Sequence, residues 1–231
     1  MQENEVDVWI ADLDLLRNSF SDFQKLLSEQ ELVRKDQFAT SELQMNFVLS
    51  HGILHTLLQS YLGIKNDEIN IAYGVHGKPF LQHSTSLQFN LSHSKNLAIY
   101  GFTKNVAVGV DVEYMEEAAL LDGTQDYLFS HPEKKVFDLL NPEEKKLAFF
   151  HTWTRKEAVR KAQGVGLLEP LDGVEMVITP KDPPKILKID KDDPAEWSLF
   201  TLDVGNDFVG ACAVKAPDFI LGKCKIIKHF F

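Results

Sequence analysis

The stretch NPEEKKLAFFHTWTRKEAVRKAQG, residues 141–164, carries start and stop signals for one long helix. Asn141 is a suitable N-cap, Pro142 fits the first helical position, and Glu143 and Glu144 complement the positive end of the helix dipole. We expect this helix to run to Gly164. Later runs are predicted to form strands, at residues 172–178, 196–202 and 208–216. A long helix followed by strands indicates an α+β arrangement.

The first part of the chain has the same plan. Residues 6–13 alternate apolar side chains, which predicts a strand. Capping-box patterns start at Ser28 and Ser41, so we expect helices to begin near residues 29 and 42, the second ending at Gly63. Further strands are predicted at residues 68–74, 87–92, 97–102 and 106–114. Internal duplication would explain this parallel, although no sequence repeat is visible.

Composition narrows the class of protein. The 231 residues have a net charge of -10, which argues against nonspecific binding to nucleic acid. No stretch approaches the ~20 apolar residues of a membrane span, and the acidic start lacks the apolar region of a signal peptide. Cys212 and Cys224 have no metal-like spacing, which fits a reducing compartment. We therefore expect a soluble, cytoplasmic protein without a membrane or nucleic-acid partner.

Asp111 and Glu113 lie two residues apart on a predicted strand, so both side chains leave the same face. Neighbouring carboxylates repel each other, and a divalent cation removes that repulsion. Mg²⁺ in particular is usually held by one or two carboxylates, with water and substrate phosphates completing its shell. A solvated strand face is the alternative interpretation.

The predicted helix at 142–164 carries a stripe of side chains four residues apart: Phe149, Trp153, Glu157 and Lys161. Glu157 could be a third carboxylate of a metal site or a general base, and Lys161 a phosphate contact. The alternative is an ordinary surface ion pair beside two core aromatic residues.

Ser92 and His93 interrupt the apolar run FNLSHSKNLAIYGF at residues 89–102. Adjacent strand residues point to opposite faces, which disfavours direct activation of Ser92 by His93. Contacts to a polar ligand suit the stretch better. Lys78, in a Gly-Lys-Pro turn, is a candidate phosphate or nucleotide contact. His51 and His55 have zinc-like spacing but lack a third ligand, so a pair on one helix face is favoured.

Four motifs in this order, GKPFLQ, FNLSHS, VGVDVEY and WTRKEAVRKAQGVGL, resemble the pattern of the long, surfactin-type 4'-phosphopantetheinyl transferases. The resemblance covers about residues 28–180. It implies transfer of the phosphopantetheine arm of coenzyme A to a serine of an acyl or peptidyl carrier protein. The reaction would depend on Mg²⁺ and release adenosine 3',5'-bisphosphate. It also implies two pseudo-symmetric α+β halves, each a long helix on a small antiparallel sheet, with the active site in the cleft between them. We place these halves at residues 1–113 and 114–231.

The resemblance assigns roles to individual residues. Asp111, Glu113 and Glu157 match the carboxylates for the metal and pyrophosphate, and either Glu157 or a metal-bound water would deprotonate the serine. Lys161 matches the lysine that meets the pyrophosphate. The nucleotide end of coenzyme A, with its 3'-phosphate, would be met by Ser92, His93, Lys78 and Arg34.

Asn46 and His55 stand where the resemblance leads us to expect arginines on the first long helix, which weakens the expected binding of the 3'-phosphate. An acidic carrier protein would dock on local features of this acidic chain, such as Arg155, Lys156 and Arg160, or on apolar contacts around Val165, Leu167 and Leu168. A monomer is expected, since a duplicated chain builds its own cleft. The alternatives are a catalytically silent relative that binds coenzyme A or a carrier, and an unrelated Mg²⁺-dependent phosphoesterase.

Overall fold

The computed structural model describes residues 2–82, 86–116, 124–165 and 171–227. The first series of elements begins with a strand, continues through three helices, and ends with four strands. In chain order these are β1 (Glu5–Asp12), α1 (Phe20–Gln24), α2 (Glu29–Asp36), α3 (Ser41–Leu62), β2 (Ile71–Tyr73), β3 (Pro79–Leu81), β4 (Leu87–Ser94) and β5 (Leu97–Lys104). Short 3-10 helices lie at Asp14–Ser19 and Asn66–Glu68.

The second series repeats this order and adds one strand. Its elements are β6 (Val108–Tyr114), α4 (Thr124–Leu128), α5 (His131–Leu139), α6 (Pro142–Gln163), β7 (Val174–Met176), β8 (Ile186–Ile189), β9 (Ser198–Leu202), β10 (Phe208–Val214) and β11 (Ile220–Ile227). Short 3-10 helices lie at Leu171–Gly173 and Pro194–Glu196. The long helices α3 and α6 have the same length, 22 residues.

Sheet pairing follows the same duplication. One sheet has the order β11-β1-β5-β4 and the other β6-β10-β9, so β1, β5 and β4 correspond to β6, β10 and β9. The predicted α+β fold with two similar halves is therefore confirmed. One feature was not predicted: β11 pairs with β1 in parallel, which makes the first sheet mixed. The remaining pairs in both sheets are antiparallel.

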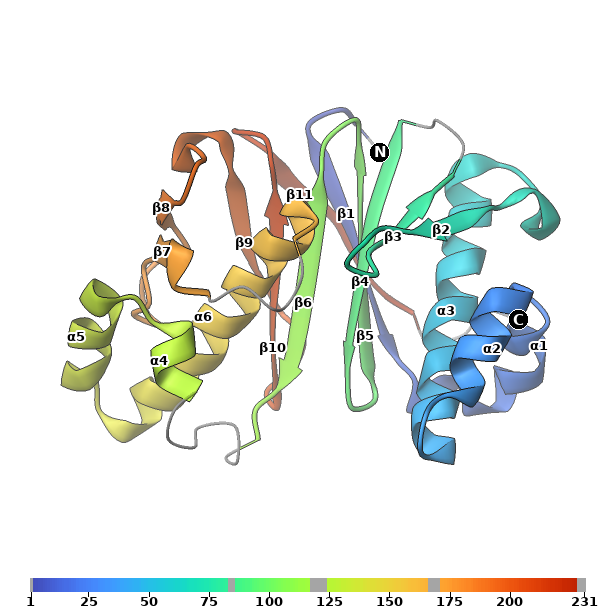
Figure 1. Ribbon diagram of the computed structural model, residues 1–231, viewed down its shortest axis with the longest axis horizontal. Coiled ribbons are helices and arrows are strands. Elements are labelled where there is room, and N and C mark those ends of the chain that lie inside the picture. Colours follow the sequence, from blue (N-terminus) through green and yellow to red (C-terminus); the bar gives the residue numbers. More distant parts are fainter. Residues whose placement is uncertain (1, 83–85, 117–123, 166–170, 228–231) are drawn as a thin grey trace.

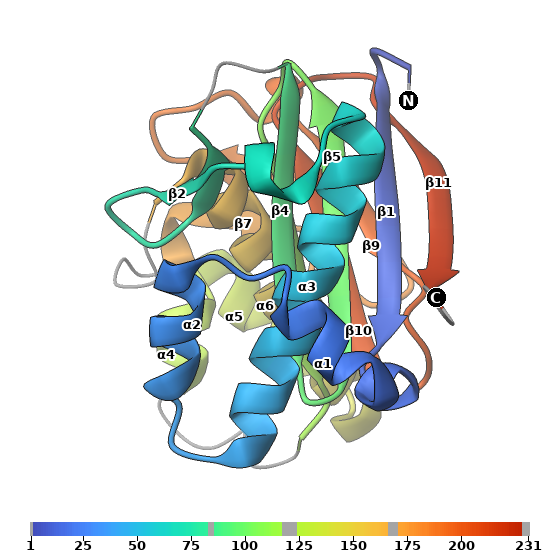
Figure 2. The same cartoon turned by 90° about the vertical axis from the view of Figure 1, so that its right-hand side faces the viewer.

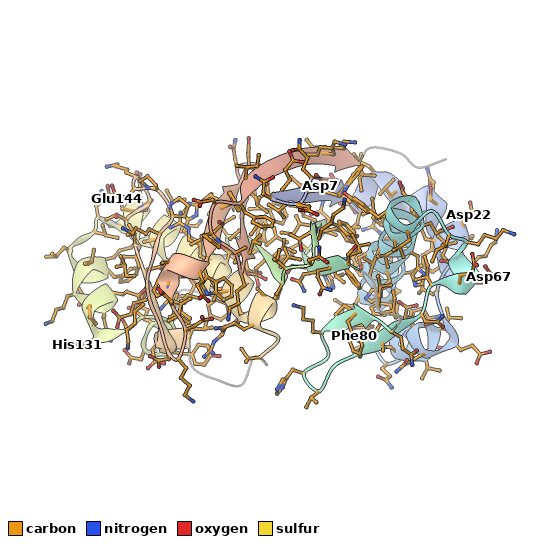
Figure 3. All side chains as sticks on the ribbon, turned by 90° about the horizontal axis from the view of Figure 1, so that it is seen from above. Asp7, Asp22, Asp67, Phe80, His131 and Glu144 are labelled. Atoms are coloured by element: carbon orange, nitrogen blue, oxygen red, sulfur yellow. The ribbon has the colours of Figure 1, made fainter. Side chains whose placement is uncertain are left out.

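The two sheets stand side by side at the centre of the molecule, and the helices lie on the two outer sides (Figure 1). Helices α1 and α3 lie in front of the outer face of the first sheet, and α2 lies to the side of α3 (Figure 2). Seen from above, Asp22 and Asp67 mark the end of the molecule formed by the first series, and His131 and Glu144 mark the opposite end (Figure 3). Buried apolar residues from both sheets form the central core, among them Val8, Ile99, Val110, Val112 and Cys212.

The helix caps explain where the long helices start and end. Asn141 accepts a hydrogen bond from Glu144 N–H, and Gly164 adopts a left-handed φ of 75° at the C-cap of α6. Gly63 does the same for α3. The predicted cap at Ser41 was wrong by one residue. Thr40 has extended backbone angles and accepts from Leu43 N–H, so Ser41 is already helical.

Gly109 on β6 lets α6 approach the second sheet very closely. A Cβ atom at this position would lie 2.0 Å from the carbonyl oxygen of Ala158 and 2.5 Å from the backbone nitrogen of Ala162. The helix can therefore pack directly on the strand backbone. This contact sets α6 against β6 at the level of Asp111.

The boundary between residues 113 and 114 stays a prediction. It falls inside β6, a strand that pairs with β10 of the second series. Strand β11 belongs by sequence to the second predicted half and pairs with β1 of the first series. Strands of the two predicted halves therefore pair with each other across this boundary.

Candidate functional site

The polar residues of β4 join the two sheets through side chains. Asn90 Oδ1 accepts from a backbone N–H of β6 at 2.8 Å. Ser92 Oγ donates to Asp111 Oδ1 at 2.9 Å, and Ser94 Oγ donates to Glu113 Oε2 at 2.8 Å. These three residues share one face of β4 because side chains alternate along a strand. The serines therefore hold the two carboxylates at the seam between the sheets.

Helix α6 brings Lys161 and Glu157 to the same place. Lys161 Nζ lies 2.6 Å from Asp111 Oδ1 and donates to Ser92 Oγ at 2.8 Å. Glu157 is only 4% exposed, and its Oε2 has no hydrogen-bond partner. The observed ion pair of Lys161 is with Asp111, and Glu157 is buried, so the surface ion-pair interpretation of this stripe does not describe the structure.

The carboxylates at this site disfavour one another's charge. Burial, followed by the negative charge of Asp111, raises the pKa of Glu157 to about 7. Burial and then Asp111 also raise the pKa of Glu113. Burial raises the pKa of Asp111, and the nearby Lys161 ammonium opposes that shift. The site therefore has a deficit of positive charge when its carboxylates are ionised.

Two features bear on whether a divalent cation fits here. Asp111 Oδ2 and Glu157 Oε2 are buried oxygens without a hydrogen-bond partner, which a cation would satisfy. Against this, residues 2–82, 86–116, 124–165 and 171–227 contain no group of three or more His, Cys, Asp or Glu side chains already placed to hold one ion. A Mg²⁺ ion that keeps water and phosphate oxygens as ligands needs only one or two carboxylates. The donor set fits such an ion.

A cavity of about 340 Å³ adjoins this cluster. Its walls come from α2, α3, α6, the β2–β3 hairpin and β4, and its lining includes Arg34, Phe38, Phe47, His51, Tyr73, Gly77, Pro79, Leu91, Ser92, His93 and Lys161. The guanidinium of Arg34 lies over two aromatic rings, 5.8 Å from the centroid of Phe47 and 5.4 Å from that of Tyr73. Arg34 and Lys161 make the wall positive. The cavity therefore suits an anionic ligand with an aromatic or apolar part.

His93 lies on the opposite face of β4 from the hydrogen bonds of Ser92 and Ser94. Burial, followed by the positive charges of its neighbours, lowers its pKa to about 4. The neighbours responsible are His51, Lys161 and Arg34. The structure therefore brings together four predicted site residues, Arg34, Ser92, His93 and Lys161, around one cavity.

Lys78 has a different environment. Its Nζ donates to the backbone carbonyl oxygens of Lys161 at 2.5 Å and of Val108 and Ala162 at 3.3 Å. Burial lowers the pKa of Lys78 to about 8. The ammonium group thus caps the C-terminal end of α6 and links the β2–β3 hairpin to the second half. A second cavity of about 160 Å³ lies beside it and also reaches Glu157 and Lys161.

Several sequence expectations need correction. Asn46 and His55, which stand where arginines were expected, are absent from the residues lining the larger cavity, whereas His51 lines it. Asn46 instead donates to Lys95 O at 2.9 Å. Arg155 and Lys156 were candidate docking residues for a carrier protein. They are 2% and 0% exposed, so their side chains are not accessible to a partner protein.

Glu31 is a site-forming residue that sequence reasoning missed. It is 1% exposed and contacts both His51 and His55. The only sequence signal was its place in the Ser28-x-x-Glu31 capping box, which indicates a helix start and not a buried cluster. Leu167 and Leu168, also considered for carrier docking, lie outside the described residues.

Comparison with known proteins gives a consistent result. A family model described as the 4'-phosphopantetheinyl transferase superfamily matches residues 107–213, and one described as 4'-phosphopantetheinyl transferase, N-terminal, matches residues 15–102. The chain is 34% identical over 214 residues to the 4'-phosphopantetheinyl transferase HetI of Nostoc sp., covering 91% of this chain and 88% of HetI. It is 23% identical over 197 residues to the 4'-phosphopantetheinyl transferase Sfp of Bacillus subtilis, covering 85% and 86%. Within the described residues, no helix has the length and apolar content that a bilayer crossing requires.

Proposed function

The chain belongs to the 4'-phosphopantetheinyl transferase superfamily and is a transferase of that type, and on this premise we propose which residues carry the reaction. Coenzyme A would bind with its nucleotide in the larger cavity and its pyrophosphate beside Lys161. Mg²⁺ would be held by Asp111 and Glu113, which share one face of β6, and Glu157 beside them would act as the general base. The acceptor would be a serine of an apo acyl or peptidyl carrier protein.

The observation that carries this proposal is the meeting of Lys161, Ser92 and Asp111 at the end of a positively lined cavity. Among the residues that the structure describes, Lys161 is the one that both contacts the carboxylate cluster and lines both cavities beside it. A pyrophosphate lying there would face a cation from α6 on one side and, on the other, the carboxylates that would hold Mg²⁺. This arrangement fits a group transfer between phosphate oxygens better than it fits nucleophilic catalysis by the protein.

The chain's own groups account for the proton and the charge in this reaction. The serine oxygen of the carrier forms a bond to the phosphorus that bears pantetheine, and the bond from that phosphorus to the bridging oxygen breaks. Glu157, in its ionised form, would take the serine proton. Lys161 stabilises the negative charge that develops on the departing adenosine 3',5'-bisphosphate. Mg²⁺ supplies further neutralisation of the pyrophosphate when it is bound.

A single labelling experiment tests this function. The protein is incubated with coenzyme A, Mg²⁺ and an apo carrier protein, and the carrier is weighed intact by mass spectrometry. A mass gain equal to one phosphopantetheine arm is expected. A catalytically silent relative would bind coenzyme A without labelling, and a phosphoesterase would consume coenzyme A without labelling. Running several acyl and peptidyl carriers in parallel identifies which class is served.

The remaining expectations are part of the same proposal. A monomer is supported by the duplicated fold, since residues of both halves line one site. A cytoplasmic location is supported by the two free cysteines, buried Cys212 and exposed Cys224, which suit a reducing compartment.

A further inference from the structure

Glu31 is the centre of a buried cluster behind the wall of the larger cavity. Its Oε1 lies 2.9 Å from His51 Nδ1, and its Oε2 lies 3.0 Å from His55 Nε2. Ser28 donates to Oε2 from both its backbone nitrogen, at 2.8 Å, and its hydroxyl, at 2.7 Å. Both carboxylate oxygens are therefore hydrogen-bonded. Burial raises the pKa of Glu31, but the hydrogen bonds and charges of His51 and His55 outweigh it and hold this pKa well below its usual range.

The two histidines differ in what surrounds their second nitrogen. His55 Nδ1 lies 2.8 Å from Asn66 Oδ1, whose own amide nitrogen donates to Leu26 O. Both ring nitrogens of His55 are therefore engaged within the cluster. Among the described residues, His51 joins the cluster through its Nδ1 contact with Glu31.

The duplicated half supports this division of roles. Glu133 occupies the same third position of α5 that Glu31 occupies in α2. Its buried partner is Lys156, at 2.6 Å, and Lys156 stands at the same distance from the N-cap of α6 as His55 stands from the N-cap of α3. In both halves a buried glutamate of the short helix thus contacts a side chain of the long helix, His55 in the first half and Lys156 in the second. His51 is the addition that the first half makes to this arrangement.

His51 is the member of the cluster that reaches the cavity. Its ring is stacked on Phe47 at a centroid distance of 4.0 Å, and Glu31 engages its Nδ1, so its orientation is fixed. Among the described residues no hydrogen bond occupies its Nε2. Burial, together with the positive charges of Arg34 and His55, lowers the pKa of His51, and Glu31 opposes this shift.

We infer that His51 is an additional binding residue for the phosphate-bearing end of coenzyme A, that Glu31 is the positioning residue that orients it, and that His51 takes up a proton when the phosphate binds. This inference rests on the proposed function, because it assigns the cavity to the nucleotide of coenzyme A. It answers how the protein manages without the arginines expected on α3. The imidazole supplies a cation only when the ligand supplies an anion.

The sign of the proton linkage follows from the surrounding charges. The groups around His51 are Glu31 and Arg34 on α2, His55 on α3, Tyr73 on β2, His93 on β4 and Lys161 on α6. Burial and the positive neighbours lower the pKa of His51, which favours its neutral form in the free protein. A phosphate dianion near Nε2 raises its proton affinity, so binding takes up a proton and tightens as pH falls. One linked proton changes Kd by at most about tenfold per pH unit.

The test compares coenzyme A with dephospho-coenzyme A, which lacks the 3'-phosphate. Calorimetry measures both dissociation constants between pH 8.5 and 6.5, in buffers of different ionisation enthalpy so that proton uptake is counted. In the unaltered protein we expect preference for coenzyme A to grow as pH falls. His51→Gln should lower this preference about tenfold or more and abolish the proton uptake. A phosphate monoester itself titrates near pH 6, and the His51→Gln protein measures that contribution separately.

His55→Gln is the matched control, because it removes a second partner of Glu31 one turn along the same helix face without touching the cavity. It should lower stability but keep the pH-dependent preference. Glu31→Gln should reduce the preference for coenzyme A, because it removes the carboxylate that engages His51 Nδ1. If His51→Gln keeps the same preference and proton uptake as His55→Gln, the inference is overturned. If the unaltered protein neither binds coenzyme A nor labels a carrier, the proposed function itself fails.

Discussion

At the scale of single residues, the site contains ionisable side chains whose burial lowers the stability of the folded protein. Glu157 is buried beside other carboxylates, and its pKa of about 7 shows that the folded state disfavours its charge. Burying a polar or charged group without a partner is unfavourable unless a ligand provides one. Such groups are typical of functional sites, where stability is exchanged for chemistry.

Glu157→Gln should therefore have opposite effects on stability and on turnover. In the unfolded chain this glutamate titrates near 4.5, whereas in the folded protein it titrates near 7. Between these values the folded state retains a proton that the unfolded chain has lost, so stability falls as pH rises and the penalty persists above pH 7. The substitution should raise metal-free stability at pH 8 by about 1 to 3 kcal/mol relative to its effect at pH 4.

The same substitution should lower carrier labelling by about 10²- to 10⁴-fold, because a positioned general base contributes that much. Thermal melts across the pH range check the predicted effect on stability, and single-turnover labelling rates check the predicted effect on turnover. Unchanged labelling would remove Glu157 from the mechanism, whatever its effect on stability.

At the scale of single elements, α3 and α6 are held by local caps at both ends and by close packing in the middle. The caps set the length of each helix. The packing of α6 on β6 sets where its functional side chains lie. These two contributions can be perturbed separately.

Thr40→Ala should destabilise the protein by about 1 kcal/mol, because the hydroxyl of Thr40 satisfies the N–H of Leu43 at the start of α3. Ser41→Ala is the matched control, and we expect it to change stability by only a few tenths of a kcal/mol, since Ser41 is inside the first turn. Urea denaturation of both variants decides which residue is the cap. A larger loss from Ser41→Ala would restore the sequence-based assignment.

Gly109→Ala should move α6 away from β6, because its Cβ would overlap backbone atoms of Ala158 and Ala162. Overpacking of this kind destabilises a fold by about 1 to 3 kcal/mol or more. Lys161 and Glu157 belong to α6 and would move with it. The rate of carrier labelling should therefore fall by more than the loss of folded protein explains. Gly74→Ala, where the nearest atom to a new Cβ is 3.7 Å away, should be close to neutral in both measurements.

At the scale of the whole molecule, two duplicated halves are joined by a shared core, by β11, and by polar contacts across the seam. Lys78 is the most direct of these contacts, because it reaches from the β2–β3 hairpin to carbonyl groups of α6 and β6. The two halves must keep their relative position for the cavity from one to meet the carboxylates of the other.

Lys78→Met should accordingly lower stability by about 1 to 3 kcal/mol, since it leaves carbonyl oxygens without their donor. Labelling at saturating coenzyme A should slow, because the last turn of α6 carries Lys161. The affinity for coenzyme A should change less than turnover does. A nucleotide contact, the role expected from the sequence, would show the reverse, with weakened binding and nearly normal stability.

Local chemistry was enough to predict a large part of this molecule. The caps Asn141, Gly63 and Gly164 depend on residues within one turn of themselves, so both ends of α6 and the C-terminal end of α3 were predictable from the sequence. Asp111 and Glu113 share a strand face for the same local reason. The resemblance of four separated motifs to a transferase family then linked these elements to a function.

The remaining features depend on contacts between residues far apart in the chain. The partner of Lys161 proved to be Asp111 on another element and not Glu157 on its own helix, because α6 packs on β6 through Gly109. Lys78 caps α6, β11 joins the sheet of the first half, and Glu31 orients His51, each through a distant contact. A sequence pattern reports periodicity and capping, which are short-range. Only the tertiary structure decides which charged groups share a buried space, and that sharing determines their protonation and their roles.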